Sequence, residues 1–216
     1  MDFAGAYSGE FLVFLLDGLW MTLKIALISI VLSFTFGCLI GIARYARVPV
    51  LSPVLAVLVE LLRNLPLLLI ILFSRFALPD LGLQLGPEGA AIAALTVFEM
   101  AMISEVVRGG LNSIPKGQIE AARSSGLSGV QTLRHIVLPQ GLRRMVPPLV
   151  SQFISLLKDT SLATAIALAE LMHNAQIIIG HSYNYAIPVL LLCAVIYFIV
   201  NYVLSLLSRR LENKMV

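Results

Sequence analysis

The stretch EAARSSGLSGVQTLRHIVLP, residues 120–139, decides how this chain is interpreted, because it is polar while its surroundings are apolar. Hydrophobic residues make up 59% of the 216 residues and charged residues only 12%, against about 25% charged in a soluble domain. A soluble fold of this size cannot bury so much apolar surface, so we expect the bilayer to act as the solvent. The polar stretch must then leave the membrane.

Hydropathy predicts five transmembrane helices, since a helix needs about 20 residues to cross the hydrocarbon layer. The expected spans are about 11–43, 49–78, 89–108, 146–162 and 185–208. The N-terminus is acidic and lacks the basic start of a signal peptide, so we expect the first span to be retained. The prediction is one all-α, polytopic membrane domain over residues 1–216.

The basic residues predict the orientation of these spans, because Lys and Arg favour the cytoplasmic side. They follow the first span, gather between the third and fourth spans, and end the chain, whereas the loop 79–89 has none. The N-terminus is therefore expected outside, and residues 109–145 and the C-terminus inside. The basic residues in question are Arg44 and Arg47; Lys116, Arg123, Arg134, Arg143 and Arg144; and Arg209, Arg210 and Lys214.

The polar stretch has its own local pattern. Residues 118–125 suit a short helix, and Gly126 can adopt the positive φ that ends one. Ser128 then begins a capping-box pattern with Gln131, which predicts a second short helix that ends at Pro139. Its apolar face would consist of Val130, Leu133 and Val137.

The residues alone leave two surfaces open for these short helices. They could lie on lipid headgroups as an interfacial amphipathic helix, or dock into the groove of a protein partner. The stretch is only weakly basic and has no Trp or Phe anchor, which slightly favours a protein.

Residues 120–139 resemble the EAA loop of ABC-importer permease subunits, whose pattern is E-A-A-x3-G-x9-I-x-L-P. Further segments are similar to polar amino acid permeases: DGLWMTLKIA (17–26), ELLRNLPLLL (60–69), SEVVRGGLNSIPKGQIEAA (104–122) and LLKDTSL (156–162). Where those permeases have an R-G-T-P-like turn, this chain has R-N-L-P, which leaves substrate detail open. The residues that match the EAA pattern are Glu120, Ala121, Ala122, Gly126, Ile136, Leu138 and Pro139.

The resemblance covers most of the chain and implies a type I importer in a bacterial cytoplasmic (inner) membrane. The two short helices would be the coupling helices that dock on an ATP-binding cassette ATPase dimer. It also implies a second permease subunit, as a homo- or heterodimer, an extracytoplasmic amino acid-binding protein and an amino acid substrate.

The chain lacks G-x-x-x-x-G-K-[ST], so ATP and Mg are expected on the partner ATPase and no cofactor in this chain. It also shows no catalytic motif and no metal-ligand spacing, so we expect no enzymatic activity. A net charge of +3 without a basic, aromatic stripe argues against nucleic acid. Composition alone leaves an ATP-independent secondary transporter or channel as the alternative.

Charged residues inside the spans are the candidate substrate site, because such groups are costly in a bilayer and are usually functional. At about 1.5 Å per helical residue, three spans bring charges to the midplane, where transporter sites lie. An amino acid needs a cation for its carboxylate and an anion for its ammonium. The candidates are Glu60 and Arg63; Glu99; and Lys158 and Asp159, followed by the hydrogen-bonding Thr160 and Ser161.

Mutual neutralisation is the alternative, since Glu60 and Arg63 are i, i+3 neighbours. The two cations give a weak lean to glutamate, aspartate or glutamine as substrate, and the acids Glu60, Glu99 and Asp159 leave a cationic amino acid open as the alternative. Glu105 and Arg108, again i, i+3, are expected to support the scaffold, and the G-x-x-x-G at Gly37 and Gly41 could pack against another helix.

Overall fold

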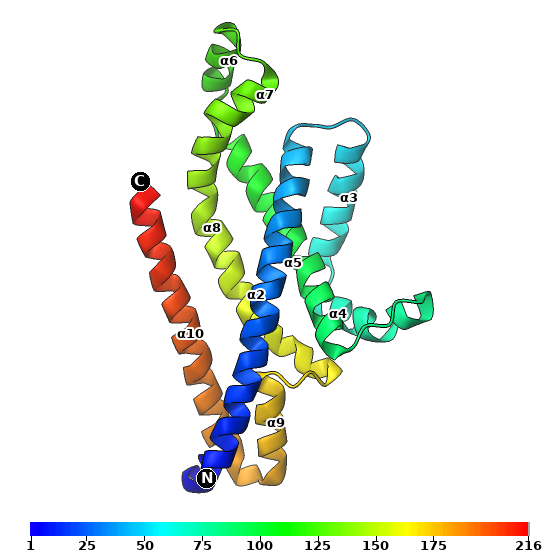
Figure 1. The fold of residues 1–216 in the computed structure, drawn as a ribbon, viewed down its shortest axis with the longest axis vertical. Coiled ribbons are helices and arrows are strands. Elements are labelled where there is room, and N and C mark those ends of the chain that lie inside the picture. Colours follow the sequence, from blue (N-terminus) through cyan, green and yellow to red (C-terminus); the bar gives the residue numbers. More distant parts are fainter. Residues whose placement is uncertain (216) are drawn as a thin grey trace.

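The computed structural model describes residues 1–215, without the side chains of 207–209 and 211–215. Within that range the chain is helical and has no strand, which confirms the all-α prediction (Figure 1). In chain order the elements are α1 (Phe3–Ala6), α2 (Gly9–Tyr45), α3 (Leu51–Asn64), α4 (Leu67–Phe76), η1 (Leu78–Leu81), α5 (Pro87–Asn112), α6 (Lys116–Ser124), α7 (Gly129–Thr132), η2 (Leu133–Val137), α8 (Leu138–Asp159), η3 (Thr160–Ile166), α9 (Leu171–His181), η4 (Tyr183–Tyr185) and α10 (Ala186–Met215).

Three stretches are long and apolar enough to cross a membrane unaided: Gly9–Tyr45, Pro87–Asn112 and Tyr183–Leu206. Two bent helix pairs, α3 with α4 and α8 with α9, raise the number to five if each pair is one span. The expected count is therefore compatible with the fold. The domain limits and the side of the membrane that each end faces stay predictions.

The second span is broken, which corrects the continuous helix expected over 49–78. Helices α3 and α4 meet at 101°, and the chain turns at Leu65 and Pro66 (Figure 1). Leu65 is extended, with φ −88° and ψ 142°, because a proline disfavours the helical conformation of the residue before it. Hydropathy predicts the apolar run but carries no information on this change of direction.

The helix that contains the fourth expected span, α8, begins at Leu138, before residue 146, and ends at Asp159. A tight 3-10 helix follows from Thr160, and Ala167 at φ 56° ends it. Helix α9 then continues at 50° to the first part. The apolar stretch after Ser161 is therefore largely helical, and with α8 it forms one of the two bent pairs.

The polar insert, residues 116–139, forms two short helices as expected. Gly126 has φ +89° between them. The capping box is complete: the Gln131 N–H donates to Ser128 Oγ at 3.3 Å, and the Ser128 N–H donates to Gln131 Oε1 at 2.8 Å. These bonds confirm the local prediction made for residues 118–131.

Two details of that prediction were wrong. Pro139 does not end the second helix; it lies in the first turn of α8. The π-helical turn η2 lets Leu138 N–H donate to Leu133 O, five residues back, so the hydrogen-bond register has already shifted before Pro139, which has no N–H to give. Leu133 and Val137 do join one core, but Val130 is 76% exposed.

Helices α2 and α5 pack at very short range, which confirms that the G-x-x-x-G on α2 contacts another helix. A Cβ at Gly37 would lie 2.6 Å from Cγ2 of Ile103, and one at Gly41 would lie 2.7 Å from the backbone oxygen of Ser104. Neither position has room for a side chain. The close pair forms the spine against which α8 and α9 pack.

The basic segments lie together at one end of the molecule. The turn after α2 and the α6–α7 insert share that end, while the N-terminus and the α9–α10 turn lie at the other (Figure 1). This grouping is the one that the predicted orientation needs. The side chains of Arg209 and Lys214, used in that prediction, lie outside the described residues, and Arg210 is exposed.

Candidate functional site

Glu99 is the most deeply buried of the expected midplane charges. It lies on α5, its side chain is 2% exposed, and its Oε1 has no hydrogen-bond partner among the described residues. Asp159, at the end of α8, lies within electrostatic range of it. Within the described part of the chain neither carboxylate forms an ion pair within 4 Å. The two acids lie on the adjoining helices α5 and α8, and we call them the carboxylate pair.

Thr160 and Ser161 lie at the rim of this pair, where α8 tightens into η3. The hydroxyl of Thr160, which is fully buried, donates to Leu157 O at 2.7 Å. The hydroxyl of Ser161 donates to Lys158 O at 2.7 Å. Both bonds satisfy carbonyls that the end of an α-helix leaves free, and each hydroxyl oxygen keeps lone pairs that can accept another bond.

Lys158 is exposed, next to Asp159, and no acid lies within 4 Å of its ammonium among the described side chains. An exposed lysine beside the half-buried carboxylate of Asp159 leaves a cation available to a ligand that approaches from that side.

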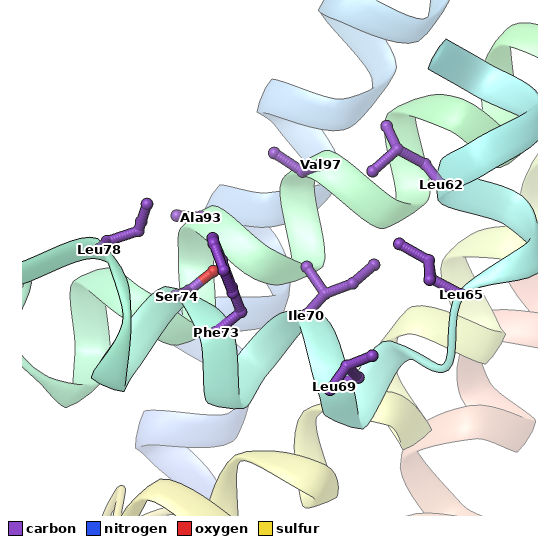
Figure 2. Close-up of a pocket in the computed structure, with 9 residues that line it drawn as sticks. All are labelled: Leu62, Leu65, Leu69, Ile70, Phe73, Ser74, Leu78, Ala93 and Val97. Carbon is purple, nitrogen blue, oxygen red and sulfur yellow. The ribbon is translucent and has the colours of Figure 1, made fainter. Parts of the chain in front are cut away.

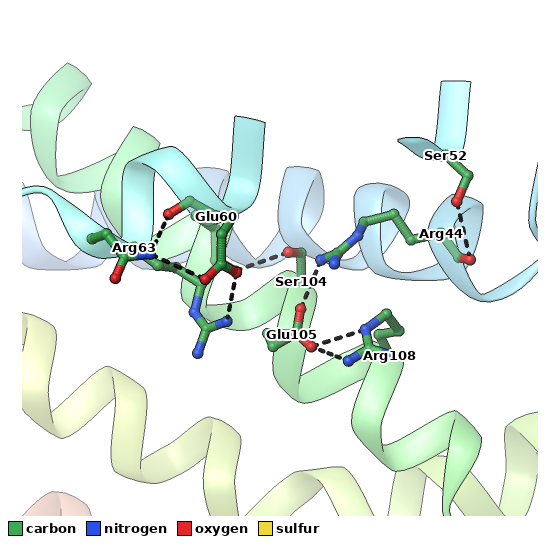
Figure 3. A network of polar contacts seen from close by, with 9 residues as sticks. Arg44, Ser52, Glu60, Arg63, Ser104, Glu105 and Arg108 are labelled. Carbon is green, nitrogen blue, oxygen red and sulfur yellow. Dashed lines mark hydrogen bonds and ion pairs between the residues drawn. The ribbon is translucent and has the colours of Figure 1, made fainter. Parts of the chain in front are cut away.

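Glu60 and Arg63 are separate from the carboxylate pair. They pair with each other on α3 at 3.8 Å, with side chains 69% and 34% exposed, and Glu60 also accepts from Asn64 Nδ2 at 3.1 Å (Figure 3). The i, i+3 pairing expected as the alternative is present. Their side chains lie on an uncovered face of α3 in the single chain.

A second ionic cluster joins α2 to α5. Glu105 accepts from Arg44 at 2.7 Å and also pairs with Arg108, one turn along its own helix (Figure 3). Arg44 is only 10% exposed. The supporting role expected for Glu105 and Arg108 fits this arrangement, and Arg44, 61 residues away in sequence, adds a link that local spacing could not predict.

An apolar cavity lies inside the elbow of α3 and α4, against α5, and has a volume of about 430 Å³ (Figure 2). No charged residue lines it, so it offers nothing to the two charges of an amino acid. Its lining residues are Leu62, Leu65, Leu69, Ile70, Phe73, Ser74, Leu78, Ala93 and Val97.

The EAA-like residues divide into a buried and an exposed set. Ala122 is 7% exposed and Leu138 packs against the core of α5 and α8. Glu120, Ala121 and Gly126 are exposed at the tip of the molecule. One set therefore fixes the insert to the spans, and the other presents it outward.

One contact ties the insert to α8: Gln140 Nε2 of α8 donates to Gln118 Oε1 of α6 at 2.7 Å. A second contact joins α8 to α5, because Arg144 of α8 donates to the Ser113 hydroxyl at the end of α5 at 3.1 Å. The insert is thus linked to α8 directly and to α5 through α8.

Glu170, which the sequence reasoning did not consider, is fully buried between η3 and α9. Residues 161–185 contain no Lys or Arg, and the predicted orientation depends on those residues alone, so this acid had no part in it. The available signal was an ionisable residue inside an otherwise uncharged span.

Apolar helices, acids inside the expected spans and a polar insert at one end are the features of a membrane transport protein. The chain belongs to the family described as binding-protein-dependent transport system inner membrane component, which matches residues 33–216. This confirms the resemblance to ABC-importer permease subunits.

Curated relatives agree with that family. The chain is 66% identical to the probable glutamine ABC transporter permease protein GlnP of Bacillus subtilis (strain 168), over 98% of both chains. It is 38% identical to the glutamine transport system permease protein GlnP of Escherichia coli (strain K12), over 93% of this chain and 92% of that one.

Solved structures share the fold. A crystal structure of an amino acid ABC transporter with histidines has a TM-score of 0.91 and 28% identity, over 99% of both chains. The MetNI methionine ABC transporter in an inward-facing conformation has a TM-score of 0.82 and 25% identity, over 97% of this chain and 99% of that one.

Proposed function

We propose that this chain is the permease subunit of an ATP-driven importer for a polar amino acid, with glutamine as the first substrate to test. The carboxylate pair of Glu99 and Asp159 is the observation that carries the proposal, because the buried Oε1 of Glu99 lacks a hydrogen-bond partner among the described residues and can accept a bond from an ammonium group. The relative that is 66% identical is described as a probable glutamine permease, which supports glutamine among the three amino acids that the sequence favours.

In this proposal the amino acid binds with its ammonium between Glu99 and Asp159. Lys158, exposed beside Asp159, receives the carboxylate, while the oxygens of Thr160 and Ser161 accept hydrogen bonds at the rim. Arg63 and Glu60, already paired on the open face of α3, meet the substrate before or after this position rather than in it.

The polar insert is proposed to dock on the ATPase. Its capped second helix presents the apolar Val130, which is 76% exposed, and an apolar side chain so far from the spans suits a groove in a protein. Glu120, Ala121 and Gly126 surround the same tip, while Ile136, Leu138 and Pro139 lead back into α8.

The bonds from Gln140 and Arg144 would carry ATPase closure into α8 and α5 as a largely rigid movement. Since Glu99 and Asp159 lie on those two helices, such a movement would carry both acids, and an ammonium bound to them, with it.

The remaining parts of the importer lie on other chains. An ATPase dimer binds ATP and Mg, a second permease subunit completes the path, identical or related, and an extracytoplasmic binding protein delivers the amino acid. The family's description as a binding-protein-dependent inner membrane component supports this assembly and the bacterial cytoplasmic membrane as its location.

Uptake by reconstituted vesicles tests the proposal. Vesicles that hold the permease with its ATPase should take up labelled glutamine from a solution of the binding protein only when hydrolysable ATP is inside. Uptake that persists with a non-hydrolysable ATP analogue, or without the ATPase, would instead establish the ATP-independent transporter.

A further inference from the structure

Glu170 is a buried carboxylate at the joint of the broken fourth span. Its side chain is fully buried, and it accepts hydrogen bonds from the N–H groups of Met172 at 2.9 Å and His173 at 2.7 Å, at the start of α9. A carboxylate at a helix N-terminus satisfies free N–H groups and is favoured by the helix dipole. The residue therefore caps α9.

Two other spans meet at the same place. The Tyr197 hydroxyl of α10 donates to Glu170 Oε2 at 3.4 Å. The Leu171 N–H donates to the buried Thr22 hydroxyl of α2 at 3.2 Å. Gly18 of α2 lies so close that a Cβ there would be 3.0 Å from the Glu170 backbone oxygen. Three elements are thus joined at one residue.

Capping alone does not require this arrangement. A serine, threonine or aspartate satisfies the first N–H groups of a helix, and none of them would reach a hydroxyl on another span. A buried carboxylate carries a desolvation penalty that a short polar cap avoids. The length and burial of Glu170 are explained by its contact with α10.

The segment that Glu170 holds begins at the carboxylate pair. Residues 160–170 start directly after Asp159 and run through η3 to Glu170. At the start of the segment, the Tyr197 hydroxyl lies near the hydroxyl of Thr160. Tyr197 therefore bonds to one end of the segment, at Glu170, and lies near the other end, at Thr160.

We propose that Glu170, acting through Tyr197, is a positioning residue for substrate binding. By fixing both ends of the segment 160–170 on α10, it holds Asp159 in place opposite Glu99. This inference rests on the proposed role of the carboxylate pair, and it adds a residue that does not itself touch the substrate.

The test uses the reconstituted importer and three substitutions. Tyr197→Phe removes only the hydroxyl. Glu170→Gln keeps the size of the side chain but replaces one carboxylate oxygen by an NH₂ group. Glu170→Asp keeps a carboxylate that can cap α9 but is too short for Tyr197. Tyr202→Phe, on the exposed side of the same helix, removes the same hydroxyl elsewhere and is the matched control.

We expect each of the three variants to raise the KM for uptake about three- to tenfold, as one lost buried hydrogen bond would, in complexes that still assemble with the ATPase. Tyr202→Phe should keep the parental KM. A role in stability alone would lower the yield of complex and leave the KM of the assembled fraction unchanged.

A wild-type KM in assembled Tyr197→Phe and Glu170→Gln complexes would overturn the inference. A wild-type KM in Glu170→Asp would also overturn it, because capping of α9 would then suffice. If Glu170→Gln does not assemble, Tyr197→Phe decides alone. A wild-type importer that moves no amino acid would instead refute the proposed function, so the two failures are distinguishable.

Discussion

Replacing Glu99 by glutamine is expected to weaken substrate binding by a calculable amount. The side chain is 2% exposed and its Oε1 is unpartnered among the described residues, so an ammonium there would form a charge-assisted bond away from water. Such a bond contributes about 1.5–3 kcal/mol, and roughly 1.4 kcal/mol corresponds to a tenfold change in affinity. The KM for uptake should therefore rise about ten- to a hundredfold.

The assay is initial-rate uptake of labelled glutamine by vesicles that contain the complete importer, over a range of substrate concentrations. Glu88→Gln is the matched control, because it makes the same change on the same helix. Glu88 pairs with Lys24 at 2.7 Å and is 37% exposed, and exposed pairs contribute little. An unaltered KM in Glu99→Gln would refute the ammonium site.

The same reasoning predicts an opposite effect on stability. Glu99→Met removes a buried carboxyl that lacks a full set of partners in the described chain, so the substrate-free complex should melt at a higher temperature. Substrate should then stabilise the parent but not the variant. A lower melting temperature for the empty variant would mean that the carboxyl supports the fold rather than the ligand.

Four further substitutions test other parts of the account. Lys158→Ala should lower uptake while assembly with the ATPase continues; unchanged uptake rejects Lys158 as the carboxylate partner. Gly41→Ala should destabilise the detergent-solubilised protein by about 1–3 kcal/mol, because its Cβ would lie 2.7 Å from a backbone oxygen of α5, whereas Gly109→Ala, with open space around it, should not; equal melting temperatures contradict this. Val130→Asp should reduce copurification of the ATPase and leave the melting temperature of the permease unchanged, and full copurification argues against docking at α7. Glu105→Gln should destabilise the protein, because it weakens two ion pairs with arginines, and thermal unfolding at the parental temperature would show that the cluster contributes nothing.

Local patterns in the sequence predicted local structure well. Gly126 and the Ser128–Gln131 pair are set by neighbours within four residues, so their φ angle and hydrogen bonds followed from residue type alone. The i, i+3 pairs of acids and arginines were found where expected for the same reason.

Features that depend on distant packing were beyond the reach of periodicity. The burial of Val137 and exposure of Val130 follow from where α5 and α8 lie, not from the helix face alone. From the sequence alone, Glu60, Glu99 and Asp159 had equal standing as candidates. The packing of α5 against α8 and η3 places Glu99 and Asp159 inside the fold, whereas Glu60 lies on an open face. The bend at Pro66 had a local signal, but hydropathy averages over it.

The most direct test of the central claim is a density map of the complete importer with bound amino acid. The account predicts ligand density with its ammonium within about 3 Å of the carboxylates of Glu99 and Asp159. Density beside Glu60 and Arg63, with the carboxylate pair empty, would contradict it.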